Sequence, residues 1–164
     1  MLISVFQLSG AAMQDREYFE DYTEGEVFVS PARTITEADI HAFAALTGDW
    51  HPLHTDVIYA AATPFKERIA HGMLVLAIGS ALGFRLGQFQ ILPKSFIAFY
   101  GMEEVRFTAP TKIADTIHAE AKIVLLEAKD SKRGLITAHT EIVNQNAKPV
   151  CVYTTKVLCG RRPV

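Results

Sequence analysis

The chain has 164 residues, of which 49% are apolar and 21% are charged. This length is typical of one domain, and this balance excludes an intrinsically disordered protein. The formal net charge of −2 gives no general attraction to nucleic acid or to an anionic membrane surface. We therefore expect one globular domain with no nucleic-acid or membrane partner.

The first 14 residues are apolar and contain no Lys or Arg. A secretory signal would have a basic start and a longer apolar run. We therefore interpret residues 1–14 as an N-terminal extension and residues 15–164 as the domain. The sequence does not decide whether Met1 or Met13 is the natural start of the chain.

Two cysteines, Cys151 and Cys159, lie eight residues apart on what reads as one strand. This spacing matches no zinc motif, and a disulfide between them is not expected. We interpret both as small core residues of a protein in a reducing compartment. The expected location is the cytoplasm.

The first half of the chain reads as loop and helix. Residues 26–35 suggest an opening strand that Pro31 interrupts. A helix is expected from Thr36, which opens a capping box, to Gly48, which can end it. The segment 49–54 is then expected to lie on a loop just beyond this helix.

A second helix is expected from Gly72 to about Leu86, and it is apolar nearly all round. Such a helix in a globular protein is buried on most of its faces. Its interruption by glycines, and its length, exclude a membrane span. Gly79 and Gly83 give it a flat side, where another part of the backbone can approach closely.

The second half of the chain reads as strands with alternating polarity. In the segment 115–127, one face is expected to carry Ile117, Ala119, Ala121, Ile123 and Leu125. The last strand, 150–158, is apolar on both faces, which indicates a central position. An α+β fold, in which an antiparallel sheet curls around the one buried helix, is the simplest architecture. The expected strands are 99–107, 115–127, 135–143 and 150–158.

Asp49 and His54 place a carboxylate and an imidazole five residues apart, on a segment that contains Pro52. Two such groups can share one water molecule. Gly72, at the start of the apolar helix, can offer a backbone N–H to a substrate oxygen. To add water to a carbonyl-conjugated substrate, or to remove it, an enzyme needs at least a group that activates water and a donor that binds the oxyanion.

These residues resemble the MaoC-like, or hydratase-2, branch of the hotdog fold. In that family an Asp-x-Asn-Pro-Leu/Ile-His loop precedes a His-Gly-Met/Leu opening of the central helix. The resemblance covers about residues 22–158, and one departure is His51, where the family usually has Asn. The matching residues are Asp49, Pro52, Leu53, His54, His71, Gly72 and Met73.

The resemblance implies a hydro-lyase that interconverts a trans-2-enoyl-CoA thioester and its (3R)-3-hydroxyacyl thioester. Asp49 and His54 would position and activate the water, and the N–H of Gly72 would stabilise the enolate oxygen. Which of the first two is the base stays open. No cofactor is expected beyond the coenzyme A that carries the substrate. Expected substrate-binding residues are Trp50, His51, His71 and Ser80.

The resemblance also implies a homodimer with a continuous sheet, because the family covers the free sheet edge by pairing two domains. Larger assemblies stay open. A hotdog thioesterase is one alternative, but it would typically carry a carboxylate on the central helix, and none occurs between Met73 and Leu86. A non-catalytic acyl-thioester binding module is another, but it would be expected to lack Asp49 or His54.

A metal centre is a third alternative. Asp49, His51, His54 and Asp56 form a cluster of ligand-type residues. Their spacing fits no zinc motif, and Gly72 would be left without a role in such a centre. We therefore expect no metal.

Overall fold

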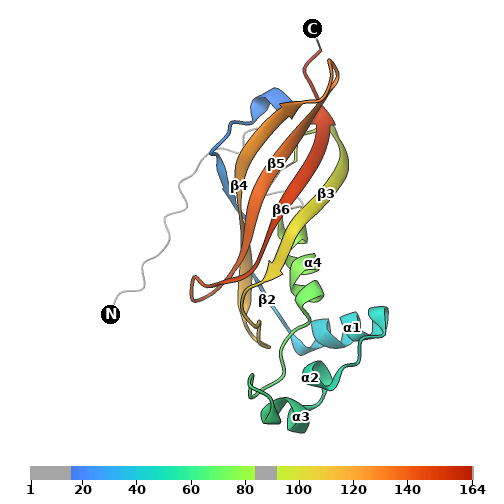
Figure 1. Ribbon diagram of the computed structural model, residues 1–164, viewed down its shortest axis with the longest axis vertical. Coiled ribbons are helices and arrows are strands. Elements are labelled where there is room, and N and C mark those ends of the chain that lie inside the picture. Colours follow the sequence, from blue (N-terminus) through green and yellow to red (C-terminus); the bar gives the residue numbers. More distant parts are fainter. Residues whose placement is uncertain (1–15, 84–91, 164) are drawn as a thin grey trace, which may run out of the picture.

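The computed structural model describes residues 16–83 and 92–163 (Figure 1). The expected extension, 1–14, and the last part of the expected central helix, 84–86, lie outside the described residues. None of the described helices has the length and apolar character needed to cross a membrane. The elements in chain order are η1 (Phe19–Asp21), β1 (Val27–Val29), β2 (Arg33–Thr34), α1 (Glu37–Thr47), α2 (Pro52–Thr55), α3 (Val57–Ala62), α4 (Gly72–Leu82), β3 (Phe96–Phe107), β4 (Thr116–Ala128), β5 (Arg133–Asn144) and β6 (Pro149–Gly160).

The strands form one antiparallel sheet in the order β1-β4-β5-β6-β3, and β2 pairs with a further part of β4. The expected opening strand is therefore present but split in two around Pro31. Strand β6 pairs with both β5 and β3, which confirms its predicted central position. β3 forms the outer strand at the other side of the sheet.

Helix α4 lies against the sheet and contacts β4 and β6 (Figure 1). Its apolar side chains form the main core together with residues from the strands. A Cβ atom at Gly79 would overlap the side chain of Ile142 on β5, so this close approach requires glycine. The α+β architecture predicted from the sequence, a sheet curved over a buried helix, is confirmed. The α4 residues buried in this core are Leu74, Val75, Leu76 and Leu82.

One predicted face of β4 is wrong beyond Ile123. The pairing of β4 with β5 shifts register between Ile123 and Leu125. Because strand side chains alternate, one extra residue moves those that follow to the opposite face. Leu125 is consequently exposed, and Leu126 packs against the core in its place.

The helices α1, α2 and α3 form a smaller lobe beyond the end of the sheet, next to the start of α4 (Figure 1). Helix α1 begins with the predicted capping box, since Thr36 accepts a hydrogen bond from the N–H of Asp39 at 3.3 Å and Asp39 accepts one from the N–H of Thr36 at 2.8 Å. It ends at Gly48, whose φ of 79° lies in the left-handed region that glycine favours. The predicted bounds of this helix are confirmed.

Candidate active site

The segment after α1 carries the predicted carboxylate and imidazole. Asp49 lies on a loop, as expected, but His54 lies within the one-turn helix α2. The prediction of a loop as far as residue 54 was therefore wrong. Pro52 takes the first helical position and His51 caps the helix, and this pair begins a helix where a loop was expected.

His51 holds this turn through its side chain. Its Nδ1 accepts a hydrogen bond from the N–H of Leu53 at 3.1 Å, and its own N–H donates to Oδ1 of Asp49 at 3.2 Å. Asn is among the residues that most often cap a helix in this way. His51 thus performs the capping for which the family's Asn is suited. Its ring is exposed, and its predicted contact with substrate stays a prediction.

His54 is fixed in one tautomer. Its Nδ1 lies 2.7 Å from the carbonyl oxygen of Ile69, and because a carbonyl only accepts, Nδ1 carries the proton. Nε2 therefore has a free lone pair. Burial lowers the pKa of His54, and the neighbouring His71 and His51 lower it further, against the raising effects of Asp49 and of the bond to Ile69. The ring is consequently neutral near pH 7 and able to accept a proton.

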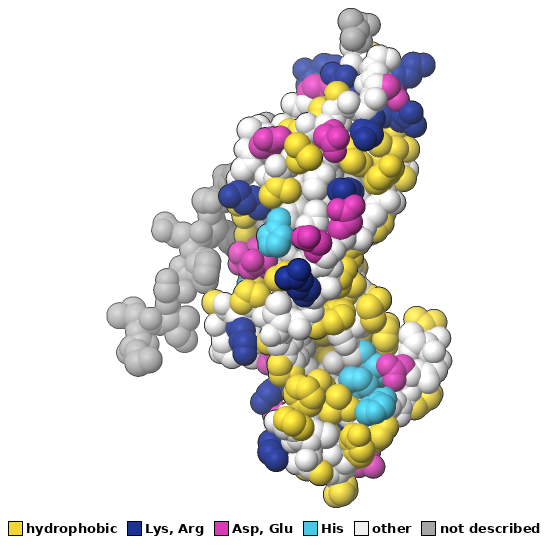
Figure 2. Space-filling view, in the orientation of Figure 1, with side chains coloured by type: hydrophobic (Ala, Val, Ile, Leu, Met, Phe, Trp, Pro, Cys, Tyr) yellow, Lys and Arg dark blue, Asp and Glu magenta, His cyan; other side chains and the backbone are white. Residues whose placement is uncertain are grey.

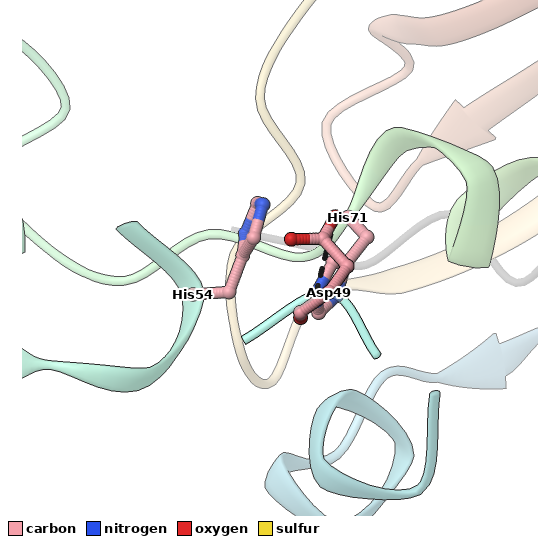
Figure 3. A group of neighbouring side chains, drawn as sticks. All are labelled: Asp49, His54 and His71. Atoms are coloured by element: carbon pink, nitrogen blue, oxygen red, sulfur yellow. Dashed lines mark hydrogen bonds and ion pairs between the residues drawn. The ribbon is translucent and has the colours of Figure 1, made fainter. Parts of the chain in front are cut away.

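His71 is buried, and its side chain lies next to those of Asp49 and His54 (Figure 3). It is only 3% exposed, its Nε2 donates to the carbonyl oxygen of Asp49 at 3.0 Å, and its ring centroid lies 3.8 Å from that of His54. The expected direct contact of His71 with substrate does not agree with this burial. The side chain instead contacts both predicted catalytic residues, through its hydrogen bond to the backbone of Asp49 and the packing of its ring on that of His54.

Ligand-type atoms of Asp49, His54 and His71 all lie within 4.8 Å of one another. The rings of the two histidines are tilted by only 30°. Because imidazole lone pairs lie in the ring plane, rings stacked in this way direct them side by side rather than toward one point. The group therefore suits a shared water better than a metal ion. Asp56, part of the metal cluster considered above, instead caps α3 by accepting from the N–H of Tyr59 at 3.0 Å.

Gly72 is the first residue of α4. The first N–H groups of a helix have no acceptor within it, and they lie at the positive end of the helix dipole. A Cβ atom on Gly72 would lie 3.0 Å from three ring carbons of Phe107, at the end of β3. Glycine therefore lets the aromatic ring lie close to the helix start, beside the N–H predicted to bind an oxyanion.

Ser80 lies further along α4, about 12 Å from Gly72 at the usual helical rise. Its Oγ donates to the carbonyl oxygen of Ala77 at 3.1 Å, and the residue lines a cavity between α4 and the sheet. Trp50 is 53% exposed and is not among the described lining residues. These include Gly79, Gly83, Ala119, Ala121, Ile123, Ile136, Ala138, Tyr153 and Val157.

Sequence reasoning missed this cavity, although a signal was present. Ala119 and Ala121 of β4 and Ala138 of β5 read as part of an ordinary buried face, whereas in the structure these small side chains line the space between the sheet and α4. The sequence does not show which small residues face each other until the strand register is known.

Comparisons with known proteins agree with the fold. The family model described as MaoC like domain matches residues 19–146. The chain belongs to the MaoC-like family. The (R)-specific enoyl-CoA hydratase of Rhodospirillum rubrum is 42% identical to this MaoC-like chain over 107 residues, which are 65% of the chain and 69% of that protein.

Two further relatives are similar to the MaoC-like chain. Protein MaoC of Klebsiella aerogenes is 42% identical over 102 residues, which are 62% of this chain and only 29% of that longer protein. The solved structure of a monoamine oxidase regulatory protein from Archaeoglobus fulgidus has a TM-score of 0.83 and 39% identity, and the match covers 92% of this chain and 98% of that one. The predicted hotdog family is therefore confirmed.

Replacing His51 tests the capping role. We expect His51→Ala to lower the free energy of unfolding by about 1 kcal/mol, because the N–H of Leu53 loses its acceptor. His51→Asn should restore most of this loss, since its amide oxygen can accept the same bond. Urea unfolding of the three proteins measures both effects. Equal stability of the Ala and Asn variants would contradict the capping role.

Proposed function

We propose that the MaoC-like chain catalyses the reversible hydration of a trans-2-enoyl-CoA thioester to the (3R)-3-hydroxyacyl thioester. The proposal is carried by one observation: the carboxylate of Asp49 and the imidazole of His54 lie together beside the start of α4, which begins at Gly72. The relative from Rhodospirillum rubrum, named (R)-specific enoyl-CoA hydratase, supports it.

In the proposed reaction, one water molecule lies between Asp49 and His54. The carboxylate and the free Nε2 of His54 both accept hydrogen bonds, so together they can hold both water hydrogens and direct a lone pair of the oxygen outward. In hydration the water oxygen forms a bond to C3, and the proton it releases is delivered to C2. Dehydration runs the same transfers in reverse. The division of acid and base roles between the two residues stays open.

The N–H of Gly72 would bind the thioester oxygen as negative charge develops on it. A donor at a helix start adds the positive end of the helix dipole to the hydrogen bond. Loss of one such donor typically raises a barrier by about 3 kcal/mol.

The cavity behind Ser80 suits the acyl tail of such a substrate. Its described walls are mostly alanine, glycine and branched aliphatic side chains, and it lies on the same helix that begins at Gly72. An apolar tail bound there would gain about 0.8 kcal/mol for each buried methylene. We therefore propose that this cavity accepts the acyl chain while the thioester lies near the helix start.

The outer edge of β3 supports a homodimer. No strand among the described residues pairs with this edge, and its side chains are unusually apolar and exposed. Figure 2 shows hydrophobic side chains gathered along this side of the sheet. A long unpaired apolar edge invites pairing, and a second copy offers the matching edge. The exposed apolar residues of β3 are Phe96, Ile97, Phe99, Tyr100, Val105 and Phe107.

Hydration of crotonyl-CoA tests the proposed reaction directly. We expect the purified protein to remove the absorbance of the conjugated thioester, and Asp49→Asn to lose that activity by at least a hundredfold because the water loses its anionic acceptor. Free thiol is measured in parallel. Thiol release would indicate a thioesterase instead. No change in either signal, together with binding of the thioester, would indicate a binding module.

Filling the cavity tests the place of the acyl chain. Ala138→Leu adds three carbons at the cavity wall, so we expect kcat/KM for a trans-2-octenoyl thioester to fall at least tenfold. Activity toward crotonyl-CoA should stay within about twofold, because the short chain does not reach this wall. Ala128→Leu, at the exposed end of β4, is the matched control. Equal loss with both substrates would contradict the assignment.

Light scattering after size exclusion tests the dimer. One chain has a mass of 18.1 kDa, so a dimer has twice that mass, about 36 kDa. We expect Ile97→Lys combined with Val105→Lys to shift the protein toward the single-chain mass, because both residues are exposed on the free edge strand. Val124→Lys places one such charge on the exposed face of β4 and should leave the mass unchanged. A single-chain mass for the unaltered protein would overturn the proposed dimer.

A further inference from the structure

His71 is the point where three separate parts of the site meet (Figure 3). It directly precedes Gly72 as the residue that caps α4. Its side chain donates from Nε2 to the carbonyl oxygen of Asp49 at 3.0 Å. Its ring lies against that of His54, with the two centroids 3.8 Å apart and the planes tilted by 30°. One residue therefore contacts the predicted carboxylate loop, the predicted imidazole and the predicted oxyanion donor.

The surroundings of His71 hold its ring in one orientation. The side chain is 3% exposed, and the ring of Phe43 on α1 packs 5.1 Å from it. The backbone is also held, because its carbonyl oxygen accepts from the N–H of Val75 in the first turn of α4 at 3.1 Å. A ring fixed from both sides can pass its orientation on to the loop that it binds.

Packing alone does not account for a histidine at this position. The Nδ1 atom of His71 is buried and has no hydrogen-bond partner among the described residues. A buried polar atom without a partner is unfavourable, and Phe would fill the same space without that cost. What Phe lacks is the N–H that reaches the carbonyl oxygen of Asp49. The donor, rather than the ring volume, is therefore the property that explains the histidine.

We propose that His71 is the positioning residue of the site: its Nε2–H holds the Asp49 loop, and its ring supports His54, so that both face the water beside the N–H of Gly72. This role rests on the proposed hydratase function. His71 itself touches neither the water nor the substrate, which agrees with its burial.

Two variants separate the donor from the ring. His71→Phe keeps an aromatic ring but loses the N–H, whereas His71→Gln loses the ring but can place an amide N–H near the position of Nε2. With crotonyl-CoA we expect kcat of the Phe variant to fall on the order of 100-fold, as misplacement of a catalytic group by about 1 Å can do. KM should change by less than about threefold. The Gln variant should recover at least tenfold of the lost kcat.

The pH dependence gives a second readout. The charged and titratable groups that face His54 are Asp49, His51 and His71. Burial lowers the pKa of His54 most, and His71 and His51 lower it further. Both variants remove the contribution of His71, so the pKa of His54 rises toward its ordinary value of about 6.5. Because neutral His54 is the active form, the acid limb of kcat/KM should move to higher pH in both variants. Imidazole NMR of His54 measures the same shift without substrate.

His41→Phe, on the exposed face of α1, is the matched control and should leave the kinetics unchanged. Melting temperatures show that each variant is folded. A folded Phe variant with kcat near that of the unaltered protein, or a Gln variant no more active than Phe, overturns the positioning role. Failure of the hydratase proposal is distinct, because the unaltered protein would then be inactive. The His54 titration would still show whether His71 acts on that ring, and an unchanged titration in both variants overturns the proposal in that case.

Discussion

The burial of α4 beneath the sheet is the constraint on which the rest of the structure depends. The helix enters the core with almost no polar side chains, and Gly79 brings it into direct contact with Ile142. Each fully buried aliphatic side chain contributes roughly 1.5–3 kcal/mol, so the helix cannot slide or rotate without a large loss. Its first residue, Gly72, is consequently held at one place relative to the end of the sheet.

That fixed helix start organises the smaller lobe. The side chain of His71 reaches the loop after α1, and the carbonyl of Ile69, just before it, accepts from His54 on α2. Both bonds run from the short segment before α4 to the two residues that would hold water. The lobe contributes the groups proposed to be reactive, but the buried helix determines where they lie. Loops held by a rigid scaffold in this way are common sites of catalysis.

The predictions from the sequence succeeded where local chemistry determines structure. The capping box of α1, its end at Gly48 and the apolar character of α4 are all visible in short segments, and all are confirmed. The predictions failed where the outcome depends on distant parts of the chain. The shift that exposes Leu125 arises from the pairing of β4 with β5. The short helix that holds His54 was missed for a local reason, because histidine is not among the residues that usually cap a helix.

The same limit applies to the site. Asp49, His54 and Gly72 were selected from their spacing, and the structure brings them to one place, but their roles stay predictions. The ring of His71 packs on that of His54, 17 positions away in the chain, and no local sequence pattern indicates this contact. The cavity likewise depends on which small residues of β4 and β5 lie on the side of the sheet that faces α4. Contacts between distant parts of the chain therefore determine both the packing of His71 on His54 and the cavity between α4 and the sheet.

Strand β3 links the proposed assembly to the proposed chemistry. Its last residue, Phe107, lies directly over Gly72, and Phe99 near its other end lines the cavity. The same strand presents its free edge and exposed aromatic side chains to the outside. A second copy that paired with this edge would reduce the freedom of Phe107 and cover the side chains around it. Because the ring of Phe107 lies against Gly72, whose N–H is proposed to bind the oxyanion, ordering the edge strand would also order that donor. The proposed dimer and the precision of the proposed site would thus be coupled through one strand.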